Sequence, residues 1–82
     1  MEYKGKKLNT MGKVFDAAIN LAKTDKEEAH KFFKLYIEHI LKNNDKVNSL
    51  NEAEKIAKGN FRYFAGYYSQ EVCDLIYETY QC

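Results

Sequence analysis

The sequence predicts an all-α protein, a small bundle of four helices preceded by an extended N-terminal arm. Three observations lead to this prediction. Apolar residues recur every three or four positions through most of the chain, which is the spacing of one buried helix face. Two stretches, "TDKE" at 24–27 and "SLNE" at 49–52, have the form of the capping box that starts a helix. The 82 residues contain no proline and are enough for one domain.

The first nine residues, "MEYKGKKLN", have no helical spacing and predict an extended basic arm over 1–9. Residues 10–82 then form a single helical domain. Thr10 is the predicted N-cap of a first helix over about 10–23. The apolar stripe of this helix consists of Met11, Val14, Phe15, Ala18 and Ala22.

The second helix is predicted over about 25–42, with Thr24 as the cap of the first capping box. Its apolar positions cover more than half of the helix circumference. They are Ala29, Phe32, Phe33, Leu35, Tyr36, Ile37, Ile40 and Leu41. A helix this apolar is expected at the centre of the bundle, with neighbours on more than one side.

The third helix is predicted over about 50–68, starting at the second capping box. Its core stripe is Leu50, Ala53, Ala57, Phe61, Phe64 and Tyr68. The stripe stays in phase through Gly59, which favours one continuous helix. The alternative is a helix that ends at Gly59 and a new one that starts at Asn60. Ser69 is the predicted cap of a last helix over 70–80, with Val72, Ile76 and Tyr80 inward.

The charge and the motifs of the chain argue against several functions. Thirteen basic and twelve acidic residues give a net charge of +1, whereas dedicated nucleic-acid-binding domains are usually strongly basic. His30 and His39 face opposite sides of one predicted helix, so they cannot share a metal ion. No phosphate loop, nucleophile elbow or HExxH motif occurs. We therefore predict a non-enzymatic protein without catalytic residues, a metal site or a cofactor.

The cysteines and the hydropathy of the chain suggest a reducing compartment. Cys73 and Cys82 are nine residues apart near the C-terminus, too distant along a helix to form a disulfide. The chain has no hydrophobic signal segment and no apolar run of membrane-spanning length. The expectation is a cytoplasmic protein that does not interact with membranes.

The most unusual stretch is "GNFRYFAGYYSQ" at 59–70, which holds five aromatic residues within eight positions. In a continuous helix, Phe61, Phe64 and Tyr68 point into the core beside Ala57 and Ala65. This half of the block is explained by packing. The remaining residues lie on the opposite face and suggest a surface that contacts another molecule.

That opposite face is the predicted binding site, made of Gly59, Arg62, Tyr63, Gly66 and Tyr67. Each glycine inside a helix costs about 0.5–1 kcal/mol relative to alanine, so a close approach by another molecule would have to offset the loss. The expected partner is a second copy of the chain, which predicts a homo-oligomer. A host protein, or a small anionic ligand held by the arginine, could also bind there. Alternatively, the fourth helix covers this face. Exposure of the two tyrosines in the monomer distinguishes that case from the others.

The N-terminal lysines suggest an alternative function. Lys4, Lys6 and Lys7 could contact a phosphate backbone while Tyr3 stacks on a base, as in a nucleic-acid-binding accessory protein. An exposed tail that keeps the protein soluble explains the same residues. A structural role inside a larger complex is the third possibility.

The block "NFRYFAGYYSQEV" at 60–72 resembles a segment of small uncharacterised proteins of phages and prophages in low-GC bacteria. The similarity covers Asn60, Tyr63, Phe64, Ala65, Gly66, Tyr67 and Tyr68, together with the preceding "EAEKIAKG". Such proteins often continue a little beyond the position of Cys82, so the resemblance implies that this chain ends early. It also implies a phage-borne protein that inhibits or sequesters a component of host defence. It implies no catalytic residues.

Overall fold

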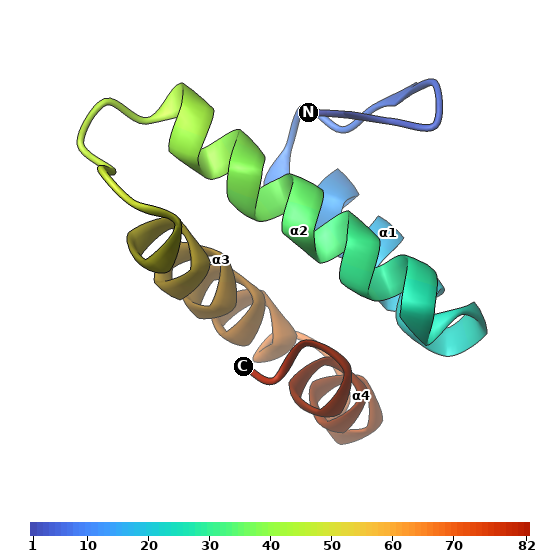
Figure 1. Ribbon diagram of the computed structural model, residues 1–82. Coiled ribbons are helices and arrows are strands. Elements are labelled where there is room, and N and C mark those ends of the chain that lie inside the picture. Colours follow the sequence, from blue (N-terminus) through green and yellow to red (C-terminus); the bar gives the residue numbers. More distant parts are fainter.

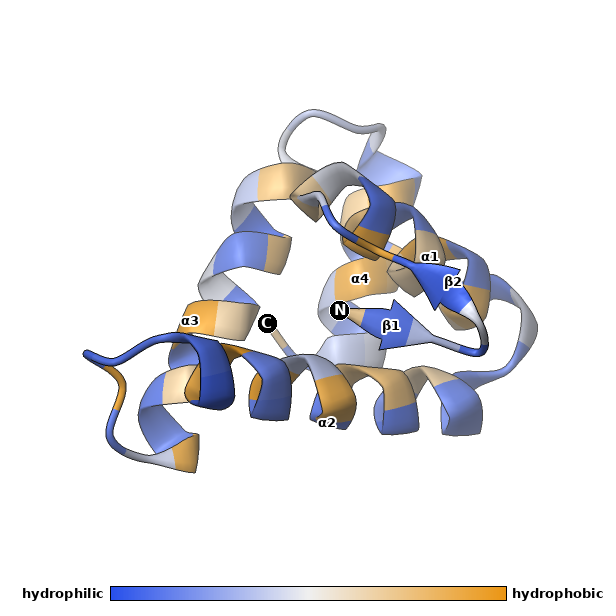
Figure 2. Cartoon of the chain, turned by 90° about the horizontal axis from the view of Figure 1, so that it is seen from above, coloured by the Kyte–Doolittle hydropathy of each residue, from blue (hydrophilic) through white to orange (hydrophobic).

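The computed structural model describes residues 1–82 and confirms the all-α prediction. A short β-hairpin precedes four helices (Figure 1). The elements are β1 (Glu2–Tyr3), β2 (Lys6–Lys7), α1 (Met11–Thr24), α2 (Lys26–Asn43), α3 (Leu50–Ala65) and α4 (Gln70–Tyr80). Both α2 and α4 pack against each of the other three helices, which confirms the central position expected for α2. In Figure 2, hydrophobic and hydrophilic positions alternate around the helices, so each helix offers the core an apolar face.

Side-chain caps set the start of every helix, and three of the four were predicted. The side chains of Thr10, Ser49 and Ser69 accept hydrogen bonds from backbone amides in the first turns of α1, α3 and α4. The prediction of Thr24 as a cap is wrong. Asp25 caps α2 by accepting from the amide of Glu28, while the Thr24 hydroxyl donates to the carbonyl of Asn20. A carboxylate is a better acceptor here because it also complements the positive end of the helix dipole.

The N-terminal arm is not a free extended segment, because it folds into a hairpin that packs on the helices. Lys4 and Gly5 have positive φ angles of 48° and 81°, the combination that a two-residue type I′ turn requires. The turn pairs Glu2 with Lys7 and Tyr3 with Lys6. Tyr3 then packs edge-on against Phe32, with ring centroids 4.9 Å apart, and its hydroxyl donates to Glu28 Oε1 at 2.5 Å. Burial and this hydrogen bond raise the pKa of Tyr3 to about 12.

The core is organised around one aromatic side chain of α3. Phe61 is fully buried, and its ring contacts Phe15 of α1, Phe33 and Tyr36 of α2, and Tyr80 of α4. The centroid distances lie between 5.0 and 5.5 Å, within the range of favourable aromatic pairs. One side chain thus joins all four helices.

Three residues that the apolar spacing placed in the core are exposed. Leu35 is 44% exposed, Leu50 is 56% exposed and Tyr68 is 40% exposed. The spacing pattern shows which residues share a helix face, but it does not show how far a neighbouring helix extends over that face. Leu50 lies in the first turn of α3, and Tyr68 lies beyond the last turn.

Helix α3 is continuous through Gly59, as predicted, but it ends at Ala65 and not at Tyr68. The amides of Gly66, Tyr67 and Tyr68 bond to carbonyls three residues earlier, which tightens the chain into a final 3₁₀-type turn. The thiol of Cys73 in α4 donates to the carbonyl of Ala65 at 2.8 Å and so satisfies an end group of the helix.

Replacing the central aromatic ring tests this account of the core. Phe61→Ala removes contacts with the three other helices and should lower the free energy of unfolding by about 3–5 kcal/mol. We expect loss of the cooperative thermal transition in circular dichroism, because a domain of this size has little stability to spare. Arg62→Ala, at the next and exposed position, is the control and should melt like the wild-type protein. Cooperative unfolding of Phe61→Ala near the wild-type temperature would contradict the central role of this ring.

Candidate tyrosine cluster and asparagine pocket

The aromatic block forms a surface cluster at the C-terminal end of α3. We call Tyr63, Phe64, Tyr67 and Tyr68 the tyrosine cluster. The Tyr63 and Tyr67 rings meet at an angle of 70° with centroids 5.5 Å apart, and their hydroxyl groups are hydrogen-bonded at 2.9 Å. This contact raises the pKa of Tyr67. The two side chains therefore support each other in one arrangement.

The cluster is anchored on the body of the protein by its other two members. Phe64 is half-buried and, like Tyr68, packs against Phe15 of α1, with ring centroids 5.9 and 5.2 Å away. The Tyr68 hydroxyl donates to Asp16 Oδ1 at 3.3 Å. These contacts attach the cluster to α1 as well as to α3.

The two outer tyrosines point into solvent. Tyr63 is 64% exposed and Tyr67 is 72% exposed, so α4 does not cover them. This excludes the interpretation in which the fourth helix folds over this part of the block. Two amphipathic rings remain available to a partner at the end of a well-packed helix.

The structure brings only part of the predicted binding site together on one surface. A Cβ atom added at Gly59 would meet nothing within 4 Å, so no close approach within the chain requires this glycine. Gly66 is the C-cap of α3, where an added Cβ would lie 3.2 Å from the carbonyl oxygen of Tyr63. Arg62 is exposed on α3, and its charge, together with that of Lys58, opposes the rise in the pKa of the Cys82 thiol that burial causes. Tyr63 and Tyr67 are joined by a hydrogen bond, whereas Arg62 forms no hydrogen bond or ion pair with either tyrosine.

The difference between the two glycines is testable. Gly59→Ala should raise the free energy of unfolding by about 0.5–1 kcal/mol, because the position is helical and open. Gly66→Ala is the matched variant and should give no such gain, because its methyl group is crowded by a carbonyl oxygen. Urea unfolding of both variants measures the difference. Equal stabilisation of both variants would contradict this account.

The hairpin lysines have different environments. Lys4 Nζ lies 3.2 Å from Glu28 Oε1 and 5.6 Å from the centre of the Tyr3 ring, whereas Lys6 and Lys7 are exposed on β2. Because Tyr3 packs against Phe32, it is not free to stack on a base. Lys6 and Lys7 therefore remain free to contact a phosphate backbone, whereas Tyr3 does not have the stacking role that the nucleic-acid alternative gave it.

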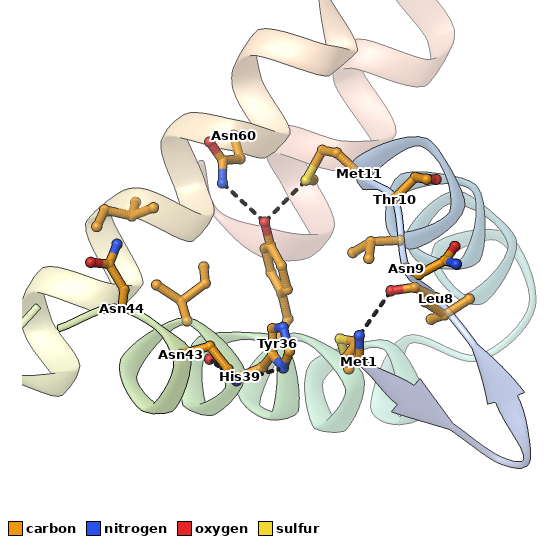
Figure 3. Close-up of a pocket in the computed structure, with 13 residues that line it drawn as sticks. Met1, Leu8, Asn9, Thr10, Met11, Tyr36, His39, Asn43, Asn44 and Asn60 are labelled. Carbon is orange, nitrogen blue, oxygen red and sulfur yellow. Dashed lines mark hydrogen bonds between the residues drawn. The ribbon is translucent and has the colours of Figure 1, made fainter.

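A second candidate site, which the sequence did not suggest, lies between the N-terminal segment, α1, α2 and α3 (Figure 3). It is a pocket of about 360 Å³, which we call the asparagine pocket. Asn9, Asn43, Asn44 and Asn60 surround it, and its apolar walls include Met11, Val14, Ile40 and Ile56. Asn43 and Asn44 are adjacent, but Asn9 and Asn60 come from distant parts of the sequence, and the four follow no common period. No local sequence pattern could therefore have predicted that these four side chains meet at one pocket.

Tyr36 stands in the middle of this pocket and fixes its geometry. Its hydroxyl donates to Met11 Sδ at 3.1 Å and accepts from Asn60 Nδ2 at 2.9 Å (Figure 3). The ring is buried and stacks on Phe61 at 5.5 Å. Tyr36 therefore connects the pocket wall with the centre of the core.

His39 lines the pocket and is half-buried there. Burial, together with the positive charge of the N-terminus, lowers the pKa of His39 below the ordinary value of 6.5. Asn43 Nδ2 lies 3.1 Å from His39 Nδ1 and donates to it, which leaves the proton of the neutral ring on Nε2. The same amide nitrogen donates to the carbonyl of His39 at 2.9 Å. The ring orientation is thus held by the next turn of α2.

This arrangement predicts a pH dependence of stability. The unfolded chain protonates His39 near pH 6.5 while the folded protein resists protonation, so acidification favours unfolding. We expect the free energy of unfolding to fall as the pH decreases from about 7 to about 5. His39→Gln should show a smaller decrease in urea unfolding over the same range. Identical pH profiles would show that His39 does not contribute. The hydrogen bond from Tyr3 lowers the pKa of Glu28 below 4.5. Protonation of that carboxylate therefore affects stability at a lower pH than the range of this measurement.

The remaining titratable groups do not form a further site. His30 Nε2 lies 2.8 Å from the carbonyl of Thr79 and links α2 to α4. Three or more His, Cys, Asp or Glu side chains do not gather anywhere in a way that could hold a metal ion. None of the four helices has both the length and the apolar character of a bilayer-spanning segment. Comparison of the chain with protein-family models, curated proteins and solved structures finds no significant match.

Proposed function

We propose that this protein is a non-enzymatic binding module that docks on another protein through the tyrosine cluster. The observation that carries the proposal is the exposure of Tyr63 and Tyr67, at 64% and 72%, in a mutually supported pair. Tyrosine offers a broad rigid ring with a polar tip, and tyrosines are enriched among the residues that dominate binding energy at interfaces. Little conformational entropy remains to be lost when such a prearranged pair binds.

The shape of the cluster favours a partner other than a second copy. Tyr63 lies in the last turn of α3 and Tyr67 just beyond it, and both side chains are exposed, so they fit a concave and largely apolar site. Two copies meeting at their clusters would place the same exposed tyrosines against each other and not in a recess. Two exposed tyrosines alone bury far less than the roughly 800 Å² per partner of a stable interface, so residues around the cluster must also contact the partner.

The resemblance to phage and prophage proteins suggests the kind of partner. A small phage-borne protein without catalytic motifs acts by occupying a surface on a host component. In this form of the proposal, the tyrosine cluster blocks or sequesters a protein of host defence. The small anionic ligand considered from the sequence receives no support from the geometry, because Arg62, Tyr63 and Tyr67 line no pocket of the protein.

Affinity capture with cluster variants tests the proposal. The immobilised wild-type protein should retain a defined partner from host cell extract, and the double variant Tyr63→Ala/Tyr67→Ala should lose it. Loss of two such residues typically weakens binding by about 2 kcal/mol or more, roughly 30-fold. Binding of the purified partner to both forms is then measured by calorimetry.

Tyr77→Ala is the matched control, because Tyr77 is 38% exposed on α4 and lies outside the cluster. All variants should keep the helical circular dichroism of the wild type, since exposed positions contribute little to stability. Light scattering should show a monomer. Unchanged partner binding by the double variant, or a dimer that the double variant abolishes, would overturn the proposal in favour of another surface or of self-association.

A further inference from the structure

The asparagine pocket contains a positive charge that no acidic residue balances. The N-terminal ammonium of Met1 lies at its wall, and the charge of this ammonium acts on His39, which lines the same pocket (Figure 3). The ammonium donates to the carbonyl of Leu8 at 2.9 Å and forms no ion pair with a carboxylate of the chain. No Asp or Glu side chain lines the pocket. A half-buried positive charge in this position favours an anion beside it.

Two groups of the pocket can donate hydrogen bonds to such an anion. The ammonium has three N–H donors, and the bond to Leu8 uses one of them. In the neutral His39 ring, Nδ1 accepts from Asn43, so Nε2 carries the proton. This Nε2–H group donates to no atom of the chain. The pocket therefore offers one charged donor and one neutral donor to the same ligand.

Most of the remaining wall is apolar. Leu8, Met11, Val14 and Ile40 line the pocket, and two of them, Leu8 and Val14, are buried. Three of the four asparagines are exposed and belong to the rim, whereas Asn60 is half-buried. An anion without an apolar part would leave these walls in contact with water. A ligand that combines an anionic group with an aliphatic chain would cover them, and a volume of about 360 Å³ accommodates such a small molecule.

We propose that the asparagine pocket binds a small aliphatic monocarboxylate, of which hexanoate is an example. The carboxylate accepts hydrogen bonds from the Met1 ammonium and from His39 Nε2, and the alkyl chain lies against the apolar walls. A carboxylate has two acceptor oxygens, so it can satisfy both donors. Its single negative charge matches the single charge of the ammonium, whereas a second negative charge would be partly desolvated without a partner. This site is separate from the tyrosine cluster.

Titration of the isotope-labelled protein with hexanoate, followed by NMR, tests this inference. We expect saturable amide shifts concentrated at residues 8–14 and 39–44. Hexanamide has the same chain without the charge and should bind at least about tenfold more weakly. Inorganic phosphate has the charge without the chain and should also bind more weakly than hexanoate. The bound carboxylate should raise the pKa of His39, followed by its ring signals, because an adjacent negative charge favours the imidazolium.

Two matched pairs of proteins test the role of the ammonium charge. A chemically synthesised chain with an acetylated N-terminus loses this charge but keeps an N–H group for the carbonyl of Leu8. It should bind hexanoate at least about tenfold more weakly than the synthetic chain with a free amino group. Asn60→Asp places a negative charge at the half-buried wall and should weaken binding about tenfold as well. Asn51→Asp makes the same change of net charge at an exposed position of α3 outside the pocket and should bind like the wild type.

Circular dichroism checks that each form is folded, and the acetylated chain decides the matter if Asn60→Asp is not. Equal affinity for hexanoate and hexanamide, or unchanged binding by the acetylated chain, would overturn the inference. The absence of saturable shifts at the pocket, or tighter binding of phosphate, would do the same. Tyr63→Ala/Tyr67→Ala should bind hexanoate like the wild type, so failure of this site and failure of the tyrosine cluster are distinguishable.

Discussion

The structure depends on the burial of one phenylalanine at the junction of four helices. The ring of Phe61 contacts an aromatic side chain from α1, α2 and α4. A chain of this length buries a limited share of its apolar surface, so such a central contact carries a large part of its stability. The orientation of α3 follows from it, because the helix must turn residue 61 inward.

That orientation explains why two tyrosines are exposed in a protein with a small core. Residues two positions apart on a helix point in directions about 200° apart, so an inward Phe61 forces Tyr63 outward. The next turn is closed by 3₁₀-type bonds and by the thiol of Cys73, which places Tyr67 beside Tyr63. The exposed pair is thus a consequence of how α3 is packed and how it ends.

The asparagine pocket has a different origin. Helices α1 and α3 are the one pair that does not pack closely together, and Tyr36 reaches from α2 into the space between them, with hydrogen bonds to Met11 of α1 and Asn60 of α3. Leu8 and Asn9, which follow the hairpin, also line the pocket. Asn60 lines the pocket and Tyr63 belongs to the tyrosine cluster, so one helix supports both candidate sites.

The sequence by itself determined the four helices, most of their ends and the inward positions of Phe15, Phe32 and Phe61. Periodicity and capping act between residues a few positions apart, so a single sequence records them. It also indicated that Tyr63 and Tyr67 face outward. Only the tertiary structure decided that the N-terminal segment folds back as a hairpin, that Leu35 and Leu50 stay exposed, and that four asparagines surround one pocket. Those features depend on where other helices begin and end in space, and that information is not contained in the spacing of residues along any one helix.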